Sequence, residues 1–313
     1  MLDAASKTFF HLIAQSRTLN KLASRYGMRK TASFARRFIA GETIAEAIEA
    51  TRGVEARGLL ITLDLLGESV TTLGEAEAAT RGYLAVIDAI VASGIERNIS
   101  LKLTQLGLDV DRASAVDNLR KILGRAGPDG FFVRIDMEGS AYTEVTLDIF
   151  ETLWGHGYQQ MGIVLQSALY RTEQRDLARV NALGARIRLV KGAYKEPKAV
   201  AHPRKADVDA AYIRMMKTLI TDGHYPAIAT HDPEVIAIAK QWASDHGVAA
   251  DRFEFQMLYG VRRDLQAMLV KDGYRVRVYI PFGREWFPYF MRRLGERPAN
   301  VMFVVRGILV DSG

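Results

Sequence analysis

Short apolar segments rich in β-branched residues alternate along the chain with longer segments of helical periodicity. Eight apolar segments read as strands: LLITLDLLGE (59–68), NISLKLTQLG (98–107), FFVRIDMEG (131–139), MGIVLQSAL (161–169), RIRLVKGAY (186–194), YPAIATHD (225–232), FEFQMLYG (253–260) and RVRVYIPFG (275–283). The stretches between them, such as EAEAATRGYLAVIDAIVASG, have helical spacing and end in glycine, as helices often do. The alternation predicts parallel strands joined by helical crossovers.

Eight strands alternating with helices over roughly 250 residues are typical of an α/β fold, the (β/α)8 TIM-type barrel. Parallel strands need helical crossovers, and both faces of their sheet must be covered. A doubly wound sheet is the alternative. It usually has fewer strands and often a Gly-rich phosphate turn after the first one, where LDLLGES offers a single glycine. The pattern therefore favours the barrel.

The part of the chain before the first strand reads as additional N-terminal helices. Residues 1–50 form this predicted helical segment, with a break at 41–43 and Thr43 as a helix cap. We expect it to cover the bottom of the barrel. Residues 51–313 then form the barrel domain, which ends in a helix after strand eight.

Composition and charge narrow the class of partner. The chain has 313 residues, 49% of them hydrophobic, which is enough to bury a sizeable core. Its net charge of +6 comes from 42 Lys and Arg against 36 Asp and Glu, spread along the sequence. This favours anionic small molecules or an acidic membrane surface over nucleic acid. A basic binding module without enzymatic activity stays an alternative, against which the scattered charge argues.

The absence of cysteine excludes disulfides, thiolate zinc sites and cysteine nucleophiles, and it fits a reducing cytosol. The N-terminal stretch MLDAASKTFFHLIAQSRTLNKL carries charges and amides through its apolar run, so we expect neither a signal peptide nor a transmembrane span there. No apolar run reaches about 18 residues. We expect a cytoplasmic protein, and an amphipathic helix on the inner face of the cell membrane stays open.

Polar residues gather late in the predicted strands. In a TIM-type barrel the site lies at the carboxyl ends of the strands. The residues at these ends are Glu68, Lys102, Gln105, Asp136, Glu138, Gln166, Arg188, Lys191, Thr230, His231, Asp232, Gln256 and Tyr279. One charged strand residue alone can be a paired structural group, whereas strand ends that are polar throughout the barrel indicate a site.

The stretch RRLGERPAN places Arg292 and Arg293 one turn before Glu296, on the helix after strand eight. Such a helix lies beside the mouth of the barrel. Adjacent arginines offer fork geometry to a small carboxylate. The alternative is a solvated helix face on which the arginines pair with Glu296.

Other chemistries have weaker support. Six histidines are scattered, and only His231 has an acid beside it at a strand end, so we predict no metal site. GxSxG and Walker sequences are absent. Lys102 and Lys191 leave a Schiff-base lyase as an alternative. Each has an acid or arginine nearby, and nothing in the sequence shows an apolar pocket that would lower a lysine pKa.

The motifs LKLTQLG, RIDME, VLQS, RLVKGAY, ATHD, FEFQMLYG, RVYIPFG and RRLGERPAN occur in this order. Together they resemble proline dehydrogenase in its short, monofunctional bacterial form, from about Gly41 to Val305. The chain is too short for the aldehyde dehydrogenase module of the bifunctional relatives.

The resemblance implies a (β/α)8 barrel that holds FAD non-covalently. It implies oxidation of L-proline to Δ1-pyrroline-5-carboxylate by hydride transfer from C5 to FAD N5, the first step of proline degradation to glutamate. Electrons would pass to a membrane quinone. The resemblance leaves the oligomeric state open and implies no nucleic acid.

Roles toward the substrate follow from the same resemblance. Lys102, Arg292 and Arg293 would bind the carboxylate, with Asp136 positioning Lys102 and Glu296 supporting the arginine helix. The residues placed around the pyrrolidine ring are Tyr279, Tyr194, Tyr289 and Leu258.

Roles toward the cofactor are implied as well. Arg188 would lie near flavin N5, act with Asp136 in catalysis, and form a gate with Glu68 in the closed state. The implied FAD contacts are Met137, Gln166, Arg188, Val190, Lys191, Gly192, Ala193, Lys205, Thr230, His231 and Gln256.

Overall fold

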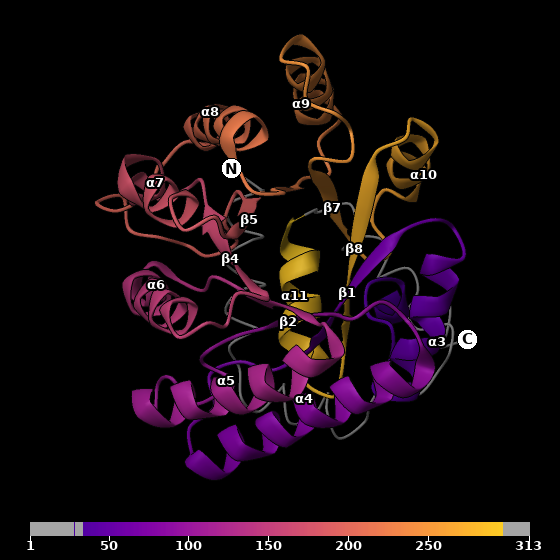
Figure 1. Cartoon of the computed structure of the whole chain (residues 1–313), viewed down its shortest axis with the longest axis vertical. Coiled ribbons are helices and arrows are strands. Elements are labelled where there is room, and N and C mark those ends of the chain that lie inside the picture. Colours follow the sequence, from indigo (N-terminus) through magenta and orange to yellow (C-terminus); the bar gives the residue numbers. More distant parts are fainter. Residues whose placement is uncertain (1–27, 29–33, 297–313) are drawn as a thin grey trace, which may run out of the picture.

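Eight parallel strands form a closed barrel in the computed structural model of the chain (Figure 1). The structure describes Met28 and residues 34–296. The strands are β1 (Leu60–Leu65), β2 (Asn98–Leu101), β3 (Phe132–Ile135), β4 (Met161–Gln166), β5 (Arg186–Val190), β6 (Ala227–Ala229), β7 (Glu254–Leu258) and β8 (Arg275–Phe282). Each strand pairs with the next, and β8 closes the ring on β1. The predicted TIM-type barrel and its eight strands are confirmed.

Helices surround this barrel. They are α3 (Ile44–Glu55), α4 (Leu73–Ser93), α5 (Arg112–Ala126), α6 (Ser140–Gly155), α7 (Leu177–Asn181), α8 (Lys205–Asp222), α9 (Pro233–Asp245), α10 (Arg263–Lys271) and α11 (Trp286–Glu296). Short turns of other helix types lie at Phe34–Arg37, Gly127–Asp129 and Thr172–Asp176. In Figure 1, α11 projects over the centre of the ring that the other helices form. None of the described helices combines the length and the apolar character needed to cross a bilayer.

Burial on both faces explains the continuous apolar runs of the strands. Every residue of β2 and β4 is buried, because one face of the sheet meets the barrel interior and the other meets the helices. Ile61, Leu63 and Ile99 are at most 1% exposed. The few polar side chains in such strands must therefore find partners inside the barrel.

Thr43 caps α3, as predicted. Its hydroxyl accepts from the backbone N–H of Glu46, and the Glu46 carboxylate accepts from the backbone N–H of Thr43 in return. The helix then packs against β1 and β8. Residue 50, the predicted domain boundary, lies inside this helix. The division into two parts stays a prediction.

The segment before α3 lies at the mouth of the barrel, which corrects the expectation that it covers the bottom. Phe38 and Ile39 pack in one apolar cluster with Phe290 and Leu294 of α11. The backbone N–H of Ala40 donates to the carbonyl of Pro281, near the carboxyl end of β8. The segment lies there because it buries the apolar face of α11, which would otherwise be exposed to water. Residues 1–27 and 29–33 of the predicted N-terminal helices lie outside the described part.

Candidate active site

A cavity of about 630 Å³ opens between the carboxyl ends of the strands and α11. The predicted site residues that line it are Lys102, Asp136, Met137, Gln166, Arg188, Val190, Lys191, Gly192, Ala193, Tyr194, Lys205, Thr230, His231, Gln256, Leu258, Tyr279, Tyr289, Arg292 and Arg293. Parallel strands bring residues this far apart in sequence to one end of the barrel.

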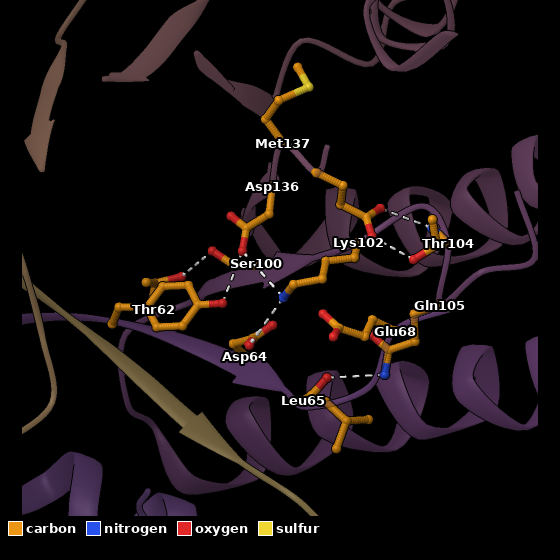
Figure 2. A network of polar contacts seen from close by, with 12 residues as sticks. Thr62, Asp64, Leu65, Glu68, Ser100, Lys102, Thr104, Gln105, Asp136 and Met137 are labelled. Atoms are coloured by element: carbon orange, nitrogen blue, oxygen red, sulfur yellow. Dashed lines mark hydrogen bonds and ion pairs between the residues drawn. The ribbon is translucent and has the colours of Figure 1, made fainter. Parts of the chain in front are cut away.

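Lys102 lies in a buried cluster of opposite charges (Figure 2). Its ammonium group is 3.5 Å from the carboxylate of Asp64 and 3.6 Å from that of Asp136. Burial by itself would lower the pKa of Lys102, but the two carboxylates outweigh burial and raise this pKa. Lys102 is therefore a fixed cation. This suits the binding of an anion and disfavours the Schiff-base alternative, which needs a neutral amine.

Asp136 is held by two further residues. One carboxylate oxygen accepts from Nη1 of Arg188 at 2.7 Å, and the other accepts from the hydroxyl of Tyr279 at 2.9 Å. Burial, together with the charges of Asp136 and Asp64, raises the pKa of Tyr279 well above its usual value. The tyrosine thus remains a neutral donor. Asp136 can position Lys102, Arg188 and Tyr279 together.

Arg188 is fixed at all three of its nitrogens. Besides the bond to Asp136, its Nε donates to Oε1 of Gln256 at 2.5 Å and its Nη2 donates to Oγ of Ser100 at 3.0 Å. The predicted gate pair between Arg188 and Glu68 is not formed in this structure. The guanidinium points into the barrel interior, where these partners surround it.

Glu68 pairs with Arg292 instead. Nη1 of Arg292 donates to Oε1 of Glu68 at 2.6 Å. Glu68 follows β1 and Arg292 lies on α11, so the pair joins two elements at the mouth. Burial by itself would lower the pKa of Arg292, but the negative charge of Glu68 and its hydrogen bond outweigh burial and raise this pKa. In this structure Glu68 therefore pairs with Arg292, and the gate between Glu68 and Arg188 in the closed state stays a prediction.

Arg293 lies against an aromatic ring. Its guanidinium carbon is 5.2 Å from the ring centroid of Tyr289, a cation–π distance. Burial raises the pKa of Tyr194, which lines the same cavity as a neutral phenol. Glu296 ends α11, but its side chain lies outside the described part, as do residues 297–300 of the arginine motif.

The side of the cavity near β5 and β6 combines cations with a close backbone approach. Lys191 and Lys205 both pair with Asp209, at 2.6 and 2.5 Å. Gly192 has a φ of +113°, which L side chains rarely adopt, and an added Cβ would lie 3.3 Å from that of Ala168. A glycine is therefore required at this strand end.

Hydrogen bonds orient two further predicted residues. The amide nitrogen of Gln166 donates to the carbonyls of Met137 and Glu138, at 3.1 Å each, so its amide oxygen remains an acceptor. Nε2 of His231 accepts from the backbone N–H of Leu258 at 2.9 Å. A backbone N–H can only donate, so Nδ1 of His231 carries the ring proton.

Asp64 and Ser100 also belong to the buried cluster around Lys102, and the sequence pattern did not predict them. Asp64 is fully buried, and burial raises the pKa of its carboxyl group against the charge of Lys102. Oγ of Ser100 lies 3.2 Å from the hydroxyl of Thr62 (Figure 2). It also accepts from Nη2 of Arg188. The available signal was a carboxylate inside the apolar run LLITLDLLGE, because a charge in a buried strand requires a partner.

The closed barrel and the charged cavity at its mouth define a class of protein, a (β/α)8 barrel with a polar cavity at the carboxyl ends of its strands, where enzymes of this fold have their active sites.

Comparison with known proteins narrows this class. The proline dehydrogenase family model matches residues 47–306. The chain is 42% identical to proline dehydrogenase 2 of Bacillus subtilis over 303 residues, which cover 97% of this chain and 98% of that protein. It is 41% identical to proline dehydrogenase of Deinococcus radiodurans over 313 residues, 99% of each chain. The chain belongs to the proline dehydrogenase family, a family of flavin-dependent oxidoreductases.

A solved structure shows the same fold. Proline utilization A from Bdellovibrio bacteriovorus, inactivated by N-propargylglycine, superimposes with a TM-score of 0.77 at 26% sequence identity. The match covers 83% of this chain and 32% of that longer one. The predicted family and barrel are thereby confirmed, and the roles of the individual site residues stay predictions.

Proposed function

We propose that this chain oxidises L-proline to Δ1-pyrroline-5-carboxylate with FAD as hydride acceptor, the first step of proline degradation to glutamate. The observation that carries the proposal is the convergence of Lys102, Arg292 and Arg293 on one cavity. Relatives that match nearly the whole chain are named proline dehydrogenase.

The carboxylate of proline is proposed to bind to Lys102, Arg292 and Arg293. Charge-assisted hydrogen bonds from arginine to a carboxylate are short and directional. Arg292 already pairs with Glu68 at 2.6 Å, so the substrate carboxylate must share or replace this partner. Substrate entry is therefore coupled to the Glu68–Arg292 pair at the mouth.

The amine of proline must be neutral before hydride leaves C5. A cationic ammonium in a buried cavity beside arginines is disfavoured, so its pKa falls on binding. The aromatic residues Tyr194, Tyr279 and Tyr289, together with Leu258, are proposed to pack around the pyrrolidine ring. These residues would hold C5 in place and exclude water.

The rest of the cavity fits FAD. Lys191 and Lys205 offer positive charge for a pyrophosphate, and Gly192 permits a close approach of the backbone. The amide oxygen of Gln166 offers an acceptor for a polar group, and His231 lines the same part of the cavity. Bound FAD would supply the hydride acceptor. The residues proposed to hold it are Met137, Gln166, Arg188, Val190, Lys191, Gly192, Ala193, Lys205, Thr230, His231 and Gln256.

We propose a quinone as the acceptor of the electrons, and a cytoplasmic location with contact at the inner face of the cell membrane. A net charge of +6 and a pI of about 9.4 suit an anionic lipid surface.

An absorption spectrum of the purified protein, recorded before and after anaerobic addition of L-proline, tests the proposal. We expect a flavin band that bleaches with L-proline and persists with D-proline. A protein without a flavin band, and with none restored by added FAD, would contradict the proposed cofactor. A bound flavin that L-proline leaves oxidised would contradict the proposed substrate.

A further inference from the structure

A line of buried polar side chains continues inward from Arg188. Glu254 and Gln256 lie two residues apart on β7, so their side chains leave the same face of the strand. They are 2% and 4% exposed. Arg188 of β5 and Arg277 of β8 contact them from other strands, which places all four side chains in the barrel interior.

Glu254 is an acceptor only. Arg277 donates from Nε and Nη2 to its two carboxylate oxygens, at 2.8 and 3.0 Å. Burial by itself would raise the pKa of Glu254, but the charge of Arg277 and its hydrogen bonds outweigh burial and lower this pKa. An ionised carboxylate accepts hydrogen bonds and donates none.

Gln256 connects the Glu254 carboxylate to Arg188 through two hydrogen bonds. Its amide nitrogen donates to Oε1 of Glu254, so its amide oxygen faces the other way and accepts from Nε of Arg188 at 2.5 Å. A guanidinium has only donors. The carboxylate at one end and the guanidinium at the other therefore enforce the same orientation of the amide.

We propose that Glu254 is a positioning residue that holds the guanidinium of Arg188 in the active site by fixing the orientation of Gln256. Asp136 and Ser100 hold the remaining two nitrogens, so Arg188 is a preorganised positive charge. The consequence for catalysis rests on the proposed function. A charge fixed before the reaction stabilises negative charge on a reduced flavin without the cost of reorientation.

Glu254→Gln tests the proposal because an amide can donate as well as accept, so Gln256 is no longer forced into one orientation. In the holoenzyme we expect the rate of flavin reduction by L-proline to fall about tenfold, by analogy with the lower end of the losses caused by removing a group that orients a metal ligand. The midpoint potential of the bound flavin should fall as well, because Arg188 stabilises the reduced form less.

Glu96→Gln is the matched control. Glu96 accepts from Nη1 of Arg277 at 2.6 Å. The variant therefore weakens an ion pair of Arg277, the partner of Glu254, but removes no hydrogen bond of Gln256. It should lower thermal stability but leave the reduction rate and the potential unchanged. Equal effects of the two substitutions, or a wild-type rate and potential in Glu254→Gln, would overturn the proposal.

A double variant supplies a second readout. With Gln256→Leu already present, Glu254→Gln should add no further loss of rate, because the connection to Arg188 is gone. Additive losses would overturn the proposal. If Glu254→Gln fails to fold, Glu254→Asp replaces it, since aspartate keeps the charge opposite Arg277 but is one methylene too short to reach Gln256.

Failure of the proposed function can be distinguished from failure of the proposed role of Glu254. A wild-type protein that binds no flavin, or whose flavin L-proline leaves oxidised, contradicts the function alone. The hydrogen-bond relay from Glu254 through Gln256 to Arg188 is then tested by the NMR exchange rate of the Nε–H of Arg188. Glu254→Gln must speed this exchange relative to Glu96→Gln, and equal rates would overturn the relay.

Discussion

Arg292 and Glu68 form an ion pair at the mouth of the cavity, at 2.6 Å, and the arginine is the residue proposed to meet the substrate carboxylate. Arg292→Met keeps an unbranched stem and removes the charge. We expect the KM for L-proline to rise about ten- to hundredfold, because a charged hydrogen-bonded contact is worth roughly 1.5–3 kcal/mol. Steady-state kinetics measure the change.

Arg81→Met is the control for this substitution, since the Arg81 side chain is 68% exposed on α4. Its KM should equal that of the wild type. An unchanged KM in Arg292→Met would show that Arg292 does not bind the substrate carboxylate and would favour the alternative, a solvated helix face.

Glu138 makes stability depend on pH. Its carboxylate accepts from the hydroxyl and the backbone N–H of Thr104, at 2.6 and 3.2 Å. Burial, opposed by these bonds, raises the pKa of Glu138 from 4.5 to about 7. Between these two values the folded protein binds a proton that the unfolded chain lacks. The resulting stability is present below pH 4.5 and is lost as the pH rises through 7.

Glu138→Gln should remove this dependence. We expect the wild type to lose about 3 kcal/mol of unfolding free energy between pH 4.5 and 8 from this group, since each pKa unit is worth ~1.4 kcal/mol. Urea unfolding at both pH values measures the loss. A variant as sensitive to pH as the wild type would assign the dependence to other groups.

Residue type and strand position predicted polar residues of the cavity such as Lys102, whereas others such as Met137 were implied only by the family resemblance. The carboxyl ends of parallel strands meet at one end of a barrel, so polar residues there converge whatever their sequence separation. Their partners were harder to predict. Glu68 pairs with Arg292, 224 residues away, and its pairing with Arg188 in the closed state stays a prediction. Choosing between two arginines requires distances that no local pattern contains.

Among the elements, α11 depends on the segment before α3. Phe38 and Ile39 pack against its apolar face, and the indole N–H of Trp286 donates to Glu42 at 3.0 Å. This packing leaves Arg292 and Arg293 at the cavity. A segment that the sequence pattern predicts as a separate N-terminal helical part therefore supports α11, the helix of the two arginines.

Gly260→Ala tests this support. Gly260 has a φ of +73°, and an added Cβ would lie 1.7 Å from the carbonyl oxygen of Arg37. The left-handed backbone alone costs about 1–2 kcal/mol with alanine, and the clash displaces the segment that covers α11. We expect a lower Tm and a raised KM for L-proline, measured by thermal unfolding and steady-state kinetics.

Gly53→Ala in α3 is the matched control, because an added Cβ there meets nothing within 4 Å. Alanine in a helix is more favourable than glycine by roughly 0.5–1 kcal/mol, so this variant should be slightly more stable than the wild type. If Gly260→Ala behaves like Gly53→Ala, the segment does not hold α11.

At the scale of the whole molecule, Arg277 of β8 forms hydrogen bonds and ion pairs with residues of or next to three other strands in the barrel interior. It donates to Glu254 of β7, to the backbone carbonyl of Ile61 in β1 at 2.5 Å, and to Glu96 before β2 at 2.6 Å. These bonds lie where β8 closes the barrel on β1. Loss of the arginine therefore affects closure as well as one ion pair.

Arg277→Met should lower the unfolding free energy by about 3–5 kcal/mol, because it leaves the Glu254 carboxylate buried without its cation. Urea denaturation measures the loss. Adding Glu254→Leu should restore part of it, since the uncompensated charge is then removed as well. A loss below about 1 kcal/mol would show that water or another cation compensates Glu254.

The order of apolar and polar residues was enough to predict the barrel, its eight strands and the end at which the chemistry gathers. These features follow from local periodicity and from the burial that parallel strands require. Only the folded chain decided that Glu68 faces Arg292, that the segment before α3 lies at the mouth, and that Asp64 completes the lysine cluster. Each of these depends on distances between segments far apart in the sequence, which packing sets and periodicity does not encode.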